Sequence, residues 1–275
     1  MMKTEEQKDA EWASKTKGYL NSLDGPYHKN RLAMVDALVE GIDFTGASCL
    51  DFGCGDGVFA EMLLARGARH VHAIDIAEEM ITSAKERLRP YADRVTLEVG
   101  GVERLAYLPD RKFDHTFSLN VNAYFSQEED GSFYKESKRI MLPGGSLVIT
   151  HSNELFDMFT LNRYTQLFFE KNFSTPGTVC DVSTLLVRPD VPSRRVFGVR
   201  ENPLSYPEKL RRLGFDPVCQ EFSILHAIPP LMTPEIDFDD INKRTYPETI
   251  GWDAENKWKL AFMCSIFGSR AVARA

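Results

Sequence analysis

The segment spanning residues 49–57, CLDFGCGDG, constrains the fold of this chain more than any other. A short apolar strand ends in Asp51, three glycines follow at alternate positions, and a helical pattern begins directly after them. Glycine permits backbone conformations and close approaches that a side chain would block. This order of strand, loop and helix predicts a βαβ unit whose backbone meets a ligand at the end of a buried strand.

A second apolar stretch, residues 71–76, carries another acid, Asp75. It follows the central glycine, Gly55, by about 20 residues, the separation at which a carboxylate binds ribose hydroxyls in a nucleotide-binding βαβ unit. The alternative is that the glycines only form a tight turn. The combination of strand, loop, helix and second acid favours a nucleoside site over that alternative.

The loop differs from two common phosphate-binding loops. In the dinucleotide fingerprint two residues precede the last glycine, whereas Gly57 comes one residue early. A P-loop has lysine and a hydroxyl residue at the start of its helix, where this chain has Gly57-Val58-Phe59. Asp56 would repel a phosphate, but neither Asp51 nor Asp56 would repel an ammonium or sulfonium.

Together these motifs resemble the class I S-adenosylmethionine-dependent methyltransferases over residues 45–153. The resemblance implies an α/β fold with a doubly wound, mostly parallel, seven-stranded Rossmann-like sheet, and helical insertions that cover the substrate. It implies S-adenosyl-L-methionine as cofactor and S-adenosyl-L-homocysteine as its product. The residues at the family's cofactor positions are Asp51, Gly53, Gly55, Gly57, Asp75, Ile76 and Met80.

The resemblance also implies roles for these residues. Asp51 would order the loop and reach the methionine ammonium, and the glycines would lie along the cofactor. Asp75 would bind the ribose, and Met80 would cover the adenine. The next family motif departs from the pattern, because Gly101 stands where an aspartate usually accepts from the adenine amino group. The backbone near Gly101 and Val102, or the side chain of Glu103, remains as a candidate for that contact.

Two further groups of residues are candidates for the site. At the N-terminus, Tyr27, His28 and Arg31 are placed to cap the cofactor, with Arg31 available to the methionine carboxylate; the alternative is an exposed helix start. Asn120 follows the expected fourth strand and is assigned to the cofactor site.

Methyl transfer to a hydroxyl needs a base beside the acceptor. His151, just after the fifth strand, is the first candidate, because imidazole titrates near neutral pH. Its alternative role is a hydrogen-bonded histidine at a strand end. Tyr124 is a second candidate, and His226 is the rival base.

The rhythm of strands and helices predicts a single α/β domain over residues 1–275, which the resemblance implies to be a methyltransferase domain. It divides into an N-terminal helical cap (1–40), a cofactor-binding half (45–153), two insertions covering the substrate (154–205 and 228–255) and two segments completing the sheet (206–227 and 256–270). The expected strands lie near 48–53, 71–76, 95–99, 113–119, 146–151, 217–226 and 260–267, and the expected helices near 57–66, 78–88, 129–141 and 207–213.

Composition limits the partners. The net charge is −7 and no block of Lys and Arg stands out, which argues against a nucleic-acid partner. No apolar run approaches membrane-spanning length, and no signal peptide is visible, so we expect a cytoplasmic protein without a membrane partner. The five cysteines show no zinc spacing, and no metal site is predicted.

The resemblance predicts methyl transfer to an oxygen or nitrogen of a small-molecule acceptor, such as a sugar or a cyclic or secondary metabolite. Asn120 does not begin the Asn-Pro-Pro-Tyr type of motif used for bases and glutamine. One alternative is a noncatalytic S-adenosylmethionine-binding scaffold or regulator. Another is a protein or peptide methyltransferase. The acceptor, the pathway and the oligomeric state stay open.

Overall fold

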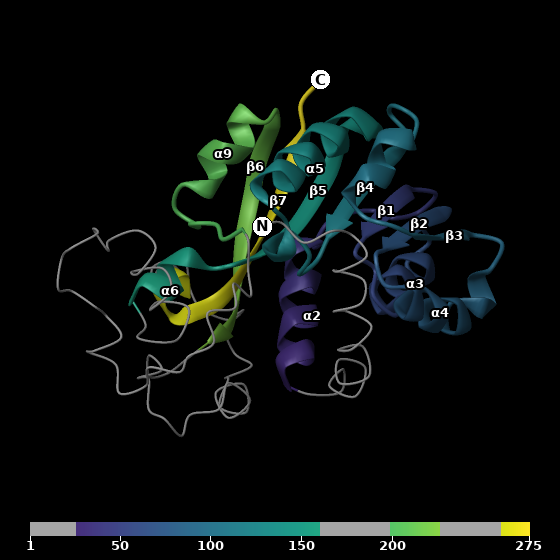
Figure 1. Ribbon diagram of the computed structural model, residues 1–275, viewed down its shortest axis with the longest axis horizontal. Coiled ribbons are helices and arrows are strands. Elements are labelled where there is room, and N and C mark those ends of the chain that lie inside the picture. Colours follow the sequence, from purple (N-terminus) through teal and green to yellow (C-terminus); the bar gives the residue numbers. More distant parts are fainter. Residues whose placement is uncertain (1–25, 160–198, 226–259) are drawn as a thin grey trace.

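The computed structural model describes residues 26–159, 199–225 and 260–275 (Figure 1). These residues build one sheet covered by helices on both faces. The strands are β1 (Ser48–Phe52), β2 (His70–Asp75), β3 (Val95–Val99), β4 (Phe113–Ser118), β5 (Met141–Ser152), β6 (Phe215–Leu225) and β7 (Cys264–Ala273).

The strand order is β3-β2-β1-β4-β5-β7-β6. β1 to β5 pair in parallel, and β7 pairs antiparallel with both β5 and β6. The order reverses between β1 and β4, and in sheets of this kind a ligand binds beyond the carboxyl ends of the strands at that point. The doubly wound, mostly parallel seven-stranded sheet expected from the sequence is confirmed.

The helices are α2 (Pro26–Leu38), α3 (Val58–Ala65), α4 (Glu78–Arg87), α5 (Gln127–Ile140), α6 (Glu154–Phe159) and α9 (Tyr206–Arg212), with short 3-10 turns η1 (Arg89–Tyr91), η2 (Val102–Tyr107) and η3 (Asn122–Tyr124). α2, α3 and α4 pack in one apolar core, and α5, α9 and η2 pack in the other. Figure 1 shows these two helical layers on opposite sides of the sheet.

Local sequence sets several element boundaries. β1 is buried at every position, as a central parallel strand requires. Gly57 begins α3 in the left-handed conformation, with φ 82°. A capping box between Ser126 and Glu129 starts α5 at Gln127, two residues before the predicted start at 129.

The last strand differs from its prediction. Residues 260–263 are helical, and β7 runs from Cys264 to Ala273 instead of over 260–267. Gly268 lies inside β7 rather than after it. A Cβ at this position would stand 2.4 Å from Leu38 Cδ1 of α2. Glycine therefore lets α2 approach the sheet closely.

The predicted covers lie mostly outside the described residues. Of the expected cap (1–40), the structure describes α2, and of the expected insertion at 154–205 it describes α6 and residues 199–205. The insertion at 228–255 lies wholly outside them. The division into cap, cofactor half and insertions stays a prediction.

Candidate functional site

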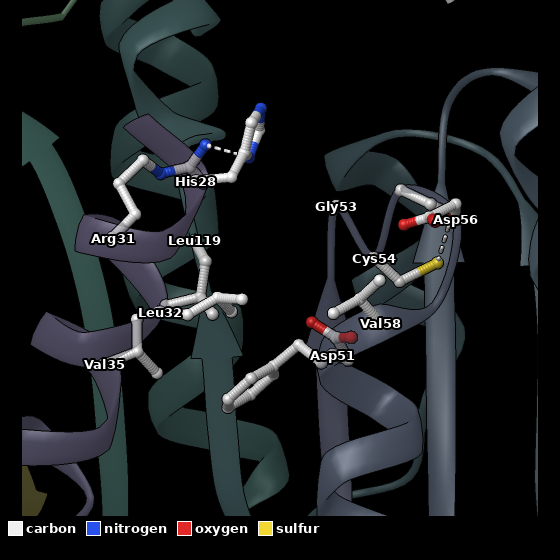
Figure 2. Close-up of a pocket in the computed structure, with 12 residues that line it drawn as sticks. His28, Arg31, Leu32, Val35, Asp51, Gly53, Cys54, Asp56, Val58 and Leu119 are labelled. Atoms are coloured by element: carbon white, nitrogen blue, oxygen red, sulfur yellow. Dashed lines mark hydrogen bonds between the residues drawn. The ribbon is translucent and has the colours of Figure 1, made fainter. Parts of the chain in front are cut away.

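A pocket lies between α2 and the glycine-rich loop that follows β1 (Figure 2). His28 and Arg31 extend from α2 on one side, and the loop carrying Gly53 and Asp56 lies across from them. Leu119, just after β4, adds to the wall. The pocket therefore sits at the reversal of strand order, where the sequence places a ligand.

Asp51 is the buried acid of this pocket. Its side chain is 1% exposed, and its Oδ2 has no hydrogen-bond partner among the described residues. Burial, followed by the charge of Asp75, raises the pKa of the Asp51 carboxyl to about 7. A ligand cation placed beside this oxygen would supply the missing partner and hold the carboxyl ionised.

Gly53 and Gly55 of the loop serve different purposes. A Cβ on Gly53 would meet Val121 Cγ2 at 1.9 Å, so this glycine allows the loop to contact the segment after β4. A Cβ on Gly55 would meet no described atom within 4 Å, and Gly55 lines the pocket. Gly55 thus leaves open backbone along which a ligand can lie.

Asp75 ties the loop to the end of β2. Its Oδ2 accepts a hydrogen bond from the Gly55 amide at 2.8 Å, and its Oδ1 accepts from the Ala77 amide at 3.0 Å. A carboxylate can accept about four hydrogen bonds, so accepting from these two amides is compatible with binding ribose hydroxyls. Next to it Ile76 is half-buried and Met80, on α4, is buried. Their ligand contacts remain predictions.

Asp56 forms an ion pair with Arg87 that was not expected from the sequence. Asp56 does not present a free charge, because Arg87 Nη2 donates to its Oδ2 at 2.7 Å and Arg87 Nε donates to its main-chain oxygen at 3.1 Å. Asp56 therefore argues less against a phosphate than its sequence position indicates. The pairing was missed because Arg87 lies 31 residues away, at the end of α4.

The segment after β3 contains the candidates for binding the adenine amino group. The Gly101 amide donates to Glu103 Oε1 at 2.8 Å, so this backbone group already has a partner. Glu103 Oε2 has none among the described residues. Val102 packs partly against the core beside α5. Of the three candidates, Glu103 has the acceptor available for an adenine amino group.

Arg31 joins α2 to the end of β4. With the amide of Asn120 turned so that its oxygen faces Arg31, it accepts from Nη1 at 3.0 Å and Nη2 at 3.2 Å. Asn120 has a positive φ of 67°. Its main-chain N–H donates to Thr150 Oγ1 at 2.8 Å. Arg31 thus lies in the pocket and is not part of an exposed helix start. Its bond to a methionine carboxylate stays a prediction.

His28, beside Arg31, is mostly buried. Burial and then the nearby guanidinium lower the pKa of its imidazole to about 4. It is therefore neutral at neutral pH. The side chain of Tyr27 lies outside the described part of the chain.

The catalytic candidates are placed less favourably. His151 is 2% exposed and packs against Tyr206 and Phe267, with ring centroids 4.6 and 5.4 Å away. Burial, and then the charge of Lys209, holds the pKa of His151 well below its ordinary value. It does not line the pocket, since side chains alternate along β5 and Thr150 is the one that reaches Asn120.

This geometry argues against His151 as the base. Tyr124 is half-buried in η3, and its catalytic role stays a prediction. His226 lies outside the described residues. Thr150 was missed by sequence reasoning, although strand alternation next to His151 is the signal that indicates it.

Neither a membrane helix nor a metal cluster occurs in residues 26–159, 199–225 and 260–275. No helix there has the length and apolar character to cross a bilayer. No group of three or more His, Cys, Asp or Glu side chains there is arranged to hold a metal ion.

Residues 49–145, which include the glycine-rich loop and Asp75, match the family model described as a methyltransferase domain. This segment of the chain is thus similar to a methyltransferase domain, as the resemblance to the class I S-adenosylmethionine-dependent methyltransferases predicts. S-adenosyl-L-methionine, the cofactor predicted from the sequence, is the cofactor of this family. The pocket fits it in two respects, the unpartnered buried oxygen of Asp51 and the open backbone at Gly55.

Curated proteins with similar sequences match about half of this chain. A ubiquinone biosynthesis O-methyltransferase from Xanthomonas oryzae is 28% identical over 136 residues, which cover 50% of this chain and 56% of that protein. The chain thus spans little more than half the length of the curated relatives it matches.

Solved structures share the fold. A putative S-adenosylmethionine-dependent methyltransferase from Listeria monocytogenes superposes with a TM-score of 0.58 at 17% identity, over 90% of this chain and 100% of that one. A chain from the complex between a Haloferax volcanii methyltransferase activator and a putative methyltransferase gives 0.60 at 17% identity, over 97% of both chains. At this level of identity the likeness establishes the sheet and its helices, and no more.

Proposed function

We propose that this protein transfers the methyl group of S-adenosyl-L-methionine to an oxygen or nitrogen of a small-molecule acceptor, such as a sugar or a cyclic or secondary metabolite. The observation that carries the proposal is Asp51, a buried carboxylate with an unpartnered oxygen in a pocket that faces Arg31. Opposite charges on the two sides of one pocket suit a ligand that carries both an ammonium and a carboxylate.

Different residues would bind different parts of the cofactor. Asp51 would bind the ammonium, and Arg31, held by Asn120, would bind the carboxylate of the methionine moiety. Asp75 would bind the ribose while keeping the Gly55 amide in place. Glu103 would accept from the adenine amino group. Each of these contacts orients the cofactor, and orientation is the larger part of the rate in a displacement whose leaving group is already good.

The bound cofactor supplies an electrophilic methyl group on a sulfonium. The bond between carbon and sulfur breaks as the bond from the acceptor atom to carbon forms. The electron pair stays on sulfur, which gives S-adenosyl-L-homocysteine, and the acceptor loses a proton to a base or to water. A hydroxyl acceptor depends on that base, whereas an amine needs only to arrive neutral.

Oxygen is the better supported acceptor atom. Several curated relatives are named as O-methyltransferases of ubiquinone biosynthesis, and one of them matches 136 residues, or 50%, of this chain. Tyr124, in η3 after β4, is then the candidate for the base within the described residues. The acceptor itself would meet the wall formed by Leu119 and α2.

Two other functions have different tests. A noncatalytic scaffold would bind the cofactor without transferring its methyl group. A protein methyltransferase would transfer the label to a polypeptide. The similarity in fold to a chain from a complex with a methyltransferase activator is the reason for testing a protein partner as well.

The deciding experiment incubates the purified protein with methyl-labelled cofactor and fractionated metabolite and protein pools, with Asp51→Asn as the control. Label in a small molecule that the control fails to produce supports the proposal. Label in a polypeptide supports a protein methyltransferase. Cofactor binding without label in any product supports a noncatalytic scaffold.

A further inference from the structure

A buried ion cluster lies between α5, α9 and the segment just before α9. Lys209 Nζ donates to Asp130 Oδ2 at 2.6 Å and to Glu201 Oε1, and stands 4.9 Å from the centre of the Tyr134 ring. Asp130 is 6% exposed and Glu201 is 9% exposed. Burying charges costs desolvation energy, and such clusters add little net stability compared with apolar packing. Its contacts therefore call for a role other than stability.

One arm of the cluster reaches the end of β4. Asp130 Oδ1 accepts from Asn122 Nδ2 at 3.4 Å, and Asn122 Oδ1 accepts from Ser118 Oγ at 2.7 Å. Ser118 and Asn122 are both fully buried. A chain of hydrogen bonds that begins at Lys209 thus fixes the position of η3.

The other arm reaches the end of β5 through the main chain of Glu201. Its amide donates to the Ser152 oxygen at 3.3 Å, and its oxygen accepts from the Glu154 amide at 2.9 Å. Two residues earlier, the Val199 amide donates to the Ala123 oxygen at 3.2 Å. The segment 199–201 therefore joins the chain after β5 to η3, and Lys209 holds this segment by the Glu201 side chain.

The segment fixed in this way touches the cofactor loop. Leu119 lines the pocket, and Val121 Cγ2 fills the space beside Gly53. None of the three charged residues lines the pocket. Among the described residues, their contacts reach the pocket through residues 118–124.

We propose that Lys209, Asp130 and Glu201 form a positioning cluster that sets residues 119–124 against the glycine-rich loop, so that the acceptor lies in line with the transferred methyl group. This inference rests on the proposed function, because the wall it fixes is the acceptor side of that site. The three residues are positioning residues and touch neither cofactor nor acceptor.

The test uses two variants and two controls of the full chain. Lys209→Met removes the charge that joins both arms, and Asp130→Asn weakens only the arm to Asn122. Lys209→Arg keeps the charge. Lys135→Met makes the matched change at an exposed lysine of α5.

The first readout is the nuclear Overhauser contact between the Val121 methyls and the Gly53 α-protons, with and without S-adenosyl-L-homocysteine. We expect Lys209→Met and Asp130→Asn to shift the Val121 methyl signals and weaken this contact, and both controls to retain it. An unchanged contact in both variants overturns the proposal, whether or not an acceptor is known. If Lys209→Met does not fold, Asp130→Asn decides.

The second readout separates positioning from general instability. With an acceptor found in the labelling screen, turnover should fall about tenfold or more in Lys209→Met and recover in Lys209→Arg, since small misplacements of reacting groups slow transfer strongly. The affinity for S-adenosyl-L-homocysteine should fall by a smaller factor than turnover does, because Asn120 bears on the cofactor only through Arg31. Full turnover in Lys209→Met contradicts the proposal. Absence of transfer by the wild-type protein contradicts the proposed function instead, and the Val121 contact still decides the positioning role.

Discussion

Asp51 is the buried acid of the proposed cofactor site. Its pKa of about 7 follows from burial and from the neighbouring Asp75. The unfolded chain loses this proton near pH 4, whereas the ligand-free folded protein keeps it to about pH 7. Because the folded pKa is raised, the contribution of Asp51 to the free energy of unfolding is largest below about pH 4 and falls as the pH rises to about 7.

Ligand binding should show the opposite trend. If an ammonium binds the ionised carboxylate, affinity for S-adenosyl-L-homocysteine rises by roughly tenfold between pH 6 and pH 8 and then levels off. Titration calorimetry across this range measures it. In Asp51→Asn the affinity should be weaker and nearly independent of pH, and a wild-type affinity that is flat from pH 6 to pH 8 would remove the linkage.

Asp75 has two functions that substitutions can separate. A carboxylate that accepts from ribose hydroxyls forms charge-assisted bonds worth about 1.5–3 kcal/mol each. Asp75→Ala should therefore weaken cofactor binding by about tenfold or more, and it also leaves the Gly55 amide without its acceptor.

Asp75→Asn is the comparison, because its amide oxygen can still accept from the loop. Calorimetry with thermal unfolding distinguishes the two effects. An Asp75→Ala protein that binds with wild-type affinity would exclude Asp75 from the site.

At the scale of elements, the glycine-rich loop allows a matched pair of substitutions. Gly55 and Gly41 both have positive φ, 56° and 74°, and neither would place a Cβ within 4 Å of a described atom. Alanine at either position costs similar backbone strain, about 1 kcal/mol. Only Gly55 lines the pocket.

We therefore expect Gly55→Ala to reduce affinity for S-adenosyl-L-homocysteine by about tenfold or more and Gly41→Ala to leave it unchanged, with similar melting temperatures. Equal affinities in the two variants would show that the loop backbone does not contact the ligand. Replacing Gly55 by a larger residue should abolish binding.

The strand β5 shows how alternation separates neighbours. Thr150 reaches Asn120 at the pocket side, whereas His151 lies on the opposite face against Tyr206. His151→Ala should therefore lower the free energy of unfolding, by about 2–5 kcal/mol as for other large buried side chains, and leave cofactor affinity intact. Urea unfolding measures the first and calorimetry the second. Lost turnover at unchanged stability would restore His151 as a catalytic candidate.

At the scale of the whole molecule, the sequence predicted most of the strands and helices that arise from periodic apolar residues. The strands, the helices between them and the acids at the carboxyl ends of β1 and β2 follow from apolar runs and glycine spacing, which are local signals. Long-range pairings were not predictable. Arg87 with Asp56, Arg31 with Asn120 and Lys209 with Asp130 join residues far apart in the chain.

We propose that the pocket between α2 and the glycine-rich loop binds S-adenosyl-L-methionine. Calorimetric titration of the purified protein with S-adenosyl-L-homocysteine, NAD and ATP, repeated with Asp51→Asn, tests it most directly. We expect S-adenosyl-L-homocysteine to bind the wild-type protein and to bind Asp51→Asn about tenfold or more weakly, with neither NAD nor ATP binding, since charge-assisted contacts carry the selectivity. Tight binding of NAD without binding of S-adenosyl-L-homocysteine would contradict the account.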